Sequence, residues 1–269
     1  TIGATDYGTD LTGAAEVAGA SRARVLAQPD DLAMLGYTGG TTGKSKGAIR
    51  RHASVVAMTN AVLAEFEWPI DPVYLSVAPI SHVGGTKLVP TLYRGGRVHL
   101  HHGFDGDRIL HDVEHEHISA TLLVPTMIYA LLDHPRLDDA DLTSLELLLY
   151  GASPMSPTRL EEGLARIGPV FSQLYGQTEC YPISVLRRAD HSRNQPELMA
   201  SCGYPCGSVD VRLLDNAGEE VSDGDTGEIC VRAPQMMDEY LNRPEQTAEA
   251  LAGGCLLYTS DAADEEAWG

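Results

Sequence analysis

The chain has 269 residues, of which 43% are hydrophobic and 21% charged, a composition typical of a globular protein with a buried core. Its 19 Lys and Arg against 38 Asp and Glu give a formal net charge of −19, which argues against nucleic acid or an anionic membrane as the main partner. No apolar run approaches the roughly 18 residues that span a bilayer. The five cysteines, an odd number, do not form a disulfide framework, and we expect a soluble, cytoplasmic protein.

The first 30 residues are rich in Ala, Gly and Thr and are expected to be a lead-in segment. Residues 32–37 predict a short buried strand that runs into a Gly/Thr-rich loop. After this loop, Ser54 is expected to cap a helix whose apolar side chains recur at helical spacing.

From residue 73 onward, short apolar runs alternate with helical patterns. Strands are expected at 73–78, 97–100, 120–124, 145–150 and 170–174, and helices at 105–115, 126–132 and 157–166. This alternation predicts an α/β subdomain over residues 31–200, with a mainly parallel sheet and flanking helices. Ligands bind such sheets at the carboxyl ends of the strands, where small-residue loops follow here. Residues 201–269 predict a β-rich subdomain with hairpins and no long helix.

The strongest local signal is the loop 37–47, Tyr-Thr-Gly-Gly-Thr-Thr-Gly-Lys-Ser-Lys-Gly. The chain has three lysines, and two of them, Lys44 and Lys46, lie in this loop. Glycines let backbone N–H groups approach an anion, threonine hydroxyls add donors and lysines add charge, which together suit a polyphosphate. A Walker-type P-loop would need Gly at Thr38 and a helix directly after the lysine. That spacing is missed by one residue, so a P-loop NTPase is a weaker alternative.

The loop resembles the phosphate-binding signature of the adenylate-forming (AMP-binding) enzymes, which include acyl-CoA synthetases, luciferases and adenylation domains of peptide synthetases. Further segments resemble motifs of that family in the same order. They are Ala78-Pro79-Ile80-Ser81-His82, Tyr150-Gly151-Ala152-Ser153-Pro154-Met155, Tyr175-Gly176-Gln177-Thr178-Glu179, Gly203-Tyr204-Pro205, 227–232 and 238–247. The resemblance covers about residues 31–261 and is strongest to bacterial fatty-acid-type acyl-CoA synthetases.

This resemblance implies a reaction. The chain would activate a carboxylic acid with ATP and Mg²⁺, forming an acyl adenylate and pyrophosphate, and then transfer the acyl group to coenzyme A. Such chemistry depends mostly on positioning and on charge neutralisation by a loop, a metal ion and cations. The apolar segment 124–129 is expected to line part of the acyl pocket, which favours a fatty or aromatic acid over a charged one.

The resemblance also implies phosphate-binding and metal-binding residues. The loop residues that would hold the β- and γ-phosphates are Thr38, Gly39, Gly40, Thr41, Thr42, Gly43 and Lys46. Thr178 would hydrogen-bond the α-phosphate. Glu179 would hold Mg²⁺, a hard cation that prefers carboxylate oxygen.

The remaining implied roles concern the nucleoside and the acid. Residues of the adenine pocket would be Gly151, Ala152 and Ser153, with Tyr175 and Gly176 at the ring. His82 would lie where the acyl carboxylate meets the α-phosphate, and Asp261 would bind the ribose hydroxyls.

Three features depart from the family pattern. Ser45 occupies the position usually taken by Pro, which leaves the loop less stiff. The stretch 253–261 matches the family's Gly-Trp-Leu-x-Thr-Gly-Asp irregularly, without the Trp. No lysine follows Lys87, so the lysine that the family's C-terminal lid domain supplies is missing. We therefore expect a fragment, also truncated before Thr1, that binds nucleotide but turns over poorly.

Two other clusters have simpler explanations. A metal site is conceivable from six histidines, His99, His101, His102, His111, His115 and His117. However, His111 and His115 lie opposite the apolar side of their helix, which favours a solvated helix face over a metal site. Cys202 and Cys206 have no second pair at zinc spacing, so packing or loop positions are favoured.

Other functions stay open beside acyl-CoA synthesis. Within the family, an amino-acid adenylation domain is the runner-up, although no acidic residue that would meet a substrate amine is identified. Outside acyl chemistry, the alternatives are the P-loop-type NTPase, which would release phosphate instead of pyrophosphate, and a catalytically silent nucleotide-binding module.

Overall fold

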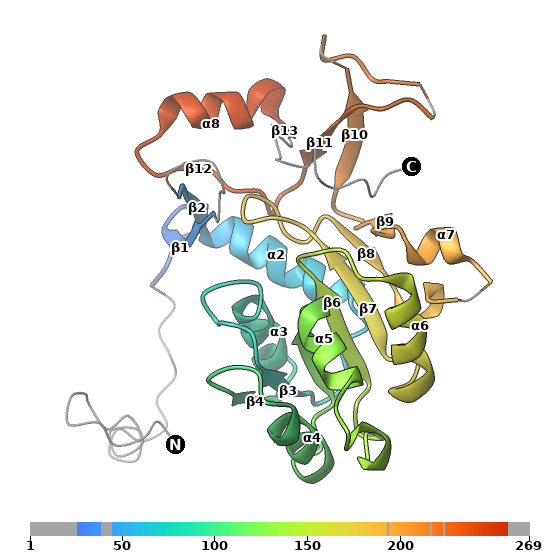
Figure 1. Cartoon of the computed structure of the whole chain (residues 1–269). Coiled ribbons are helices and arrows are strands. Elements are labelled where there is room, and N and C mark those ends of the chain that lie inside the picture. Colours follow the sequence, from blue (N-terminus) through green and yellow to red (C-terminus); the bar gives the residue numbers. More distant parts are fainter. Residues whose placement is uncertain (1–25, 39–44, 193, 216, 223, 258–269) are drawn as a thin grey trace.

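The computed structural model of the chain describes residues 26–38, 45–192, 194–215, 217–222 and 224–257 (Figure 1). Its largest sheet has seven strands. They are β3 (Val73–Ser76), β4 (Arg97–Leu100), β5 (Ala120–Leu123), β6 (Leu147–Gly151), β7 (Phe171–Tyr175), β8 (Ser184–Leu186) and β9 (Tyr204–Pro205). In the order β4-β3-β5-β6-β7 neighbouring strands are parallel, and β8 and β9 continue the sheet antiparallel. The predicted, mainly parallel α/β sheet is therefore confirmed.

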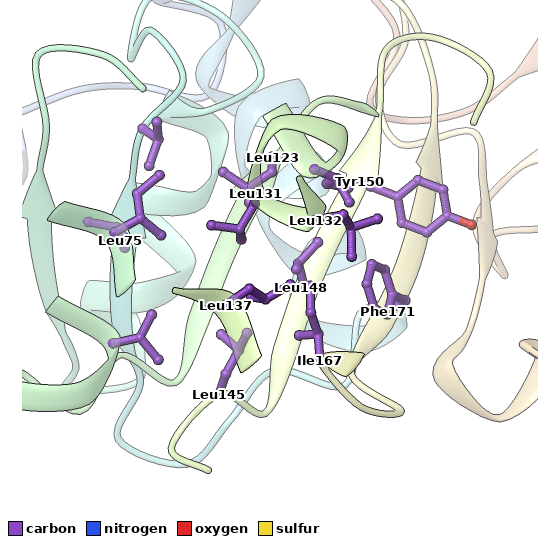
Figure 2. Packing of buried hydrophobic residues seen from close by; sticks show 14 of the residues in the cluster. Leu75, Leu123, Leu131, Leu132, Leu137, Leu145, Leu148, Tyr150, Ile167 and Phe171 are labelled. Atoms are coloured by element: carbon purple, nitrogen blue, oxygen red, sulfur yellow. The ribbon is translucent and has the colours of Figure 1, made fainter. Parts of the chain in front are cut away.

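Helices cover both faces of this sheet. Three of them, α4 (Gly106–His115), α5 (Pro125–Leu132) and α6 (Pro157–Arg166), pack against one face, where Figure 2 shows the interlocking leucine side chains. On the other face lies α2 (His52–Glu65). Strands β3, β5 and β6 are buried along their whole length because both faces are covered. Alternate residues of β6 enter the two cores, Leu148 one and Leu149 the other.

Shorter elements complete this part of the chain. They are the helices α3 (Leu88–Tyr93) and α7 (Pro196–Met199) and the 3₁₀ turns η1 (Gly85–Lys87), η2 (Leu137–Asp139) and η3 (Arg188–Asp190). The predicted boundaries hold to within a few residues. The helix expected at 126–132 begins one residue earlier, at Pro125, because a proline N–H is not needed in the first helical turn. Among the described residues, no helix is long and apolar enough to cross a bilayer.

Two predictions near the start of the chain are wrong. Strand β1 (Leu32–Tyr37) is largely exposed, not buried, because it is the edge of a small sheet with the order β1-β2-β12, in which β2 is Gly47–Arg51 and β12 is Glu239–Tyr240. Ser54 does not cap α2. The helix begins at His52 after Arg51, and the Ser54 hydroxyl donates to the Arg51 carbonyl at 3.1 Å.

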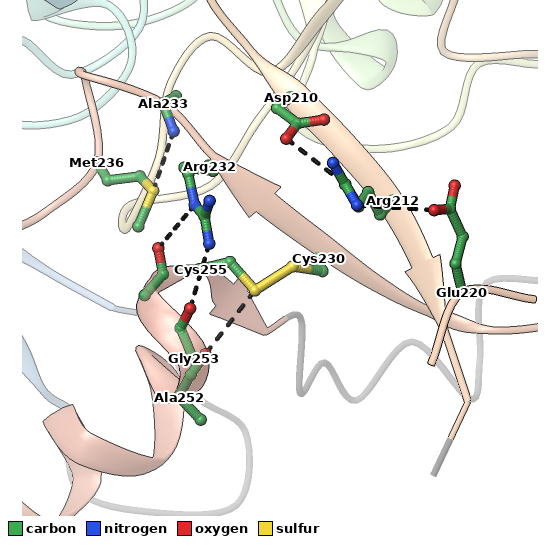
Figure 3. Close-up of a disulfide and its surroundings, with 11 residues drawn as sticks. Asp210, Arg212, Glu220, Cys230, Arg232, Ala233, Met236, Ala252, Gly253 and Cys255 are labelled. Carbon is green, nitrogen blue, oxygen red and sulfur yellow. Dashed lines mark hydrogen bonds and ion pairs between the residues drawn. A yellow bond between two sulfur atoms is a disulfide. The ribbon is translucent and has the colours of Figure 1, made fainter. Parts of the chain in front are cut away.

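The later part of the chain contains an antiparallel sheet of β10 (Asp210–Leu214), β11 (Glu228–Arg232) and β13 (Leu256–Leu257). A disulfide between Cys230 and Cys255 joins this sheet to the turn η4 (Ala252–Gly254), and Arg232 donates to two carbonyls of that turn (Figure 3). The sequence predicted no disulfide framework, and one isolated disulfide is found. The other three cysteines form none.

One short strand connects the later part of the chain to the beginning. Strand β12 (Glu239–Tyr240) pairs antiparallel with β2, and α8 (Pro244–Ala250) follows it (Figure 1). Just before β12, the backbone of Met236 forms an isolated antiparallel β-bridge with that of Cys180. This segment therefore lies against both β2, the strand that follows the Gly/Thr-rich loop, and the residues that follow β7.

Candidate active site

The two ends of the Gly/Thr-rich loop are hydrogen-bonded to each other. The Thr38 N–H donates to the Lys46 carbonyl at 2.9 Å, and the Lys46 N–H donates to Thr38 Oγ1 at 3.2 Å. The Ser45 hydroxyl donates to the Thr38 carbonyl at 2.5 Å. The loop residues between these ends, which include five of the predicted site residues, Gly39, Gly40, Thr41, Thr42 and Gly43, lie outside the described residues, as does Asp261.

Residues predicted for the adenine pocket meet at the carboxyl ends of β6 and β7. A cavity of about 120 Å³ is lined by Gly151, Ala152 and Ser153 from one strand end and by Tyr175 and Gly176 from the other. Whole ligand pockets measure roughly 300–1,000 Å³, so this cavity suits one flat part of a ligand.

The backbone of this cavity depends on close packing. A Cβ atom added to Gly151 would lie 2.2 Å from the Leu174 carbonyl oxygen, so only glycine fits. The next residue, Ala152, has a φ of 67°, a left-handed conformation that alanine rarely adopts. Backbone strain of this kind is typical of functional sites.

Sequence analysis missed one polar residue of the cavity. The Gln173 side chain lines it, and the Oε1 atom is buried without a hydrogen-bond partner in the described chain. Alternation along β7 places Gln173 on the same side as Tyr175, and this spacing of two could have identified it.

Glu179 is fixed by residues from the β12 segment. Its side chain is 9% exposed, and the Tyr240 hydroxyl donates to Glu179 Oε1 at 2.5 Å. The Met237 N–H donates to the Glu179 carbonyl at 2.6 Å. Burial and the hydrogen bond to Glu179 raise the pKa of Tyr240, so the phenol stays protonated and remains a donor. The Lys46 ammonium lies 4.4 Å from the centre of the Tyr240 ring.

Thr178 is held by a second residue that sequence analysis missed. Arg50, 3% exposed, donates from Nη2 to the Thr178 carbonyl at 2.9 Å. Burial lowers the pKa of the Arg50 guanidinium, while Cys180, Glu179 and Asp238 act in the opposite direction. An arginine stays charged under all such conditions, so a buried positive charge lies beneath the site.

His82 follows β3 in an exposed turn that is closed by its N–H donating to the Pro79 carbonyl at 3.1 Å. Within the described chain its side chain forms no hydrogen bond with Thr178 or Glu179. Behind the turn, the fully buried Lys87 donates to the Tyr181 hydroxyl and, at 2.8 Å, to Thr86 Oγ1. Lys87 therefore connects the His82 turn to the segment that follows Glu179.

The donor set at Glu179 fits a magnesium ion shared with phosphates. Among the described residues, no group of three or more His, Cys, Asp or Glu could hold a metal by itself. Mg²⁺ is usually bound through one or two carboxylates together with substrate phosphates and waters. A single carboxylate oriented by the Tyr240 hydroxyl meets that requirement.

The histidine cluster agrees in part with the predicted solvated helix face. His111 and His115 stack on each other with well-exposed side chains, as predicted. His101 differs because its side chain is 2% exposed and its Nε2 lies 2.7 Å from Asp112 Oδ2.

Residues 4–241 match the protein family described as AMP-binding enzyme. A medium/long-chain-fatty-acid–CoA ligase of Mycobacterium tuberculosis is 43% identical over 242 residues, covering 90% of this chain and 42% of that protein. A feruloyl-CoA synthase of an Amycolatopsis species is 41% identical over 228 residues, covering 84% of this chain and 45% of that protein. The structure of an amide bond synthetase from Marinactinospora thermotolerans superposes with a TM-score of 0.77 at 33% identity, covering 84% of this chain and 45% of that protein. The chain thus spans less than half the length of these relatives.

Proposed function

Because the chain belongs to the AMP-binding enzyme family, we propose that it contributes the nucleotide-binding part of an AMP-forming acid–thiol ligase. In this reaction a carboxylate oxygen attacks the α-phosphorus of ATP and pyrophosphate leaves. The thiol of coenzyme A then attacks the acyl carbon, and AMP leaves. The observation that carries the proposal is that Lys46 and Glu179 both contact Tyr240, while Tyr175, at the start of the Glu179 motif, lines the cavity.

We assign the nucleoside to the cavity between β6 and β7. The adenine ring lies against Tyr175 and Gly176, and the strained backbone at 151–153 forms the opposite wall. The unpartnered Gln173 Oε1 accepts a hydrogen bond from the exocyclic amino group of adenine. A buried acceptor without a partner is costly, so this bond favours a base that carries an amino donor there.

The phosphates are assigned to the loop base and to the residues after β7. Thr178 donates its hydroxyl to the α-phosphate, while Thr38, Lys46 and the loop residues between them hold the β- and γ-phosphates. The buried Arg50 guanidinium adds a fixed positive charge beneath Thr178. Fixed donors and charges stabilise the charge that develops during transfer without reorganising.

Glu179 is the proposed ligand for Mg²⁺. When bound, the ion neutralises phosphate charge and so makes pyrophosphate a better leaving group. The protein's part is to orient the Glu179 carboxylate, which the hydrogen bond from the Tyr240 hydroxyl supports.

The acid is proposed to enter beside His82, with its carboxylate toward the α-phosphate. The segment 124–129, which forms the start of α5, is apolar, and this composition supports a fatty acid. An aromatic acid is the second candidate, because the feruloyl-CoA synthase is nearly as similar as the fatty-acid ligase. Coenzyme A is the proposed acceptor, and the cytoplasm the proposed compartment.

A single-turnover experiment tests this function and separates it from the alternatives. The chain is mixed at stoichiometric concentration with Mg-ATP and one acid, dodecanoic, ferulic or an amino acid, and the products are identified by mass spectrometry. We expect acyl-AMP and pyrophosphate with dodecanoic acid. Release of inorganic phosphate would instead indicate a P-loop-type NTPase. An aminoacyl adenylate would indicate amino-acid activation, and ATP left intact with every acid would contradict catalysis by this chain.

A further inference from the structure

We propose that Tyr240 is a positioning residue that holds the Glu179 carboxylate and the Lys46 ammonium apart, each ready for its own part of a metal–nucleotide complex. The proposal rests on the proposed function and extends it to a residue outside the phosphate loop and the segment after β7.

The edge of the ring orients the carboxylate. Tyr240 is 4% exposed, and its hydroxyl donates to Glu179 Oε1 at 2.5 Å. A hydrogen bond to an ionised acceptor is short and roughly twice as strong as a neutral one. The bond occupies one carboxylate oxygen and leaves the other oxygen for a further ligand.

The face of the same ring orients the ammonium. Lys46 Nζ lies 4.4 Å from the centre of the Tyr240 ring, within the range of a cation–π contact. The described residues contain no ion pair between Lys46 and Glu179, although both contact this ring. An oppositely charged pair brought together would cancel the two charges that a phosphate and a divalent cation need.

The backbone of β12 fixes the ring relative to both partners. Tyr240 lies opposite Ala48 of β2, and the Leu241 N–H donates to the Gly47 carbonyl at 2.7 Å, directly after Lys46. The Tyr240 N–H in turn donates to Thr247 Oγ1 at 3.0 Å. Together with the hydrogen bond from the Met237 N–H to the Glu179 carbonyl, these contacts attach residues 237–241 both to β2 and to Glu179.

This arrangement predicts separable effects for the two parts of the side chain. Removing the hydroxyl affects only the carboxylate and therefore the contribution of Mg²⁺. Removing the whole ring also releases Lys46, which can then pair with Glu179, so that phosphate binding suffers even without metal.

The test uses the 269-residue chain and isothermal titration with ATP, in MgCl₂ and again in EDTA. For Tyr240→Phe we expect unchanged ATP affinity in EDTA and an approximately tenfold loss of the enhancement by Mg²⁺, the size expected for one bond to a charged group. For Tyr240→Ala we expect ATP affinity to fall severalfold in EDTA as well. The matched control is Tyr74→Phe, which removes a buried hydroxyl that donates to the Gly84 carbonyl and not to Glu179.

The outcomes separate the positioning role from the proposed function. If the unmodified chain binds no ATP, the proposed function fails and this inference fails with it. If the unmodified chain binds ATP but Tyr240→Phe keeps the full Mg²⁺ enhancement, or loses affinity equally in EDTA, only the positioning role is overturned. Should circular dichroism show Tyr240→Phe to be unfolded, Thr247→Ala replaces it, with an expected loss of Mg²⁺ enhancement in the same direction and of about twofold. No change in Thr247→Ala would then count against the role.

Discussion

The Ser45 hydroxyl and the Thr38 carbonyl are joined by a hydrogen bond of 2.5 Å that closes the base of the phosphate loop. The sequence motif resembles a family signature that has proline at this position, and proline has no hydroxyl to donate. The chain therefore replaces a stiff ring by a hydrogen bond between the two ends of the loop.

Substitution Ser45→Ala is expected to weaken ATP binding about three- to tenfold, because one intramolecular hydrogen bond contributes about 0.5–1.5 kcal/mol. Ser45→Pro should retain more affinity than Ser45→Ala, since a fixed φ restricts the loop by other means. Titration calorimetry with ATP measures both. The control Ser144→Ala removes a serine hydroxyl that donates to the Val113 carbonyl, remote from the loop, and should leave ATP affinity unchanged. Equal affinity of Ser45→Ala and the unmodified chain would refute the role of this bond.

Gln173 is expected to select the base. Because its Oε1 is a buried acceptor without a partner, Gln173→Leu should weaken AMP binding about tenfold, the effect of losing one buried hydrogen bond. Gln173→Glu keeps an acceptor and should lose less. A parallel titration with inosine monophosphate, which lacks the amino group, should show little difference among the three proteins. A loss of the same size for both nucleotides would assign Gln173 a packing role instead.

Gly151 is expected to tolerate no side chain. Gly151→Ala places a Cβ atom 2.2 Å from the Leu174 carbonyl oxygen, and such overpacking typically lowers the free energy of unfolding by about 1–3 kcal/mol. Separation of β6 from β7 should also reduce AMP affinity. Urea denaturation measures the stability, and Gly103→Ala, whose added Cβ would meet nothing within 4 Å, is the control. Similar midpoints for the two variants would argue against close packing at the cavity.

The predicted architecture followed from local patterns. Alternating apolar runs and helical periods placed the strands and helices of residues 73–175, because the central strands β3, β5 and β6 are buried on both faces and the helices on one. The same reasoning gave a wrong prediction of burial for the edge strand β1. Its apolar residues resemble a buried strand, but burial depends on which partners cover them, and β1 has only β2 beside it.

The site was predictable where a motif carries its own chemistry and not where distant segments meet. Thr178 and Glu179 lie in a recognisable stretch, whereas Arg50 and Tyr240 contact them from 128 and 61 residues away in the sequence. No local spacing of residues in the sequence predicts such contacts. Gln173 was predictable in part. Its alternation with Tyr175 can be read from the sequence, but only the structure shows that its Oε1 atom is buried without a hydrogen-bond partner in the described chain.

Lys87 is expected to make stability depend on pH. Burial lowers its folded-state pKa well below the usual 10.5, so the unfolded chain binds more protons between these two pKa values. Stability therefore rises with pH through that interval, by up to about 1.4 kcal/mol per pH unit, and is flat below the folded-state pKa and above 10.5. Urea denaturation from pH 7 to pH 9.5 should show this rise relative to Lys87→Met. Parallel curves for the two proteins would mean that Lys87 stays protonated in the fold.

We propose that one site recognises an acyl group and an adenylate together. Calorimetric titration of the folded chain with Mg-ATP and with a non-hydrolysable dodecanoyl-adenylate mimic tests this proposal directly. We predict that the mimic binds at least about a hundredfold more tightly than ATP, as expected for a ligand that resembles the reacting state. Equal affinities, with ATP binding intact, would contradict recognition of the acyl group and would indicate a module that binds the nucleotide alone.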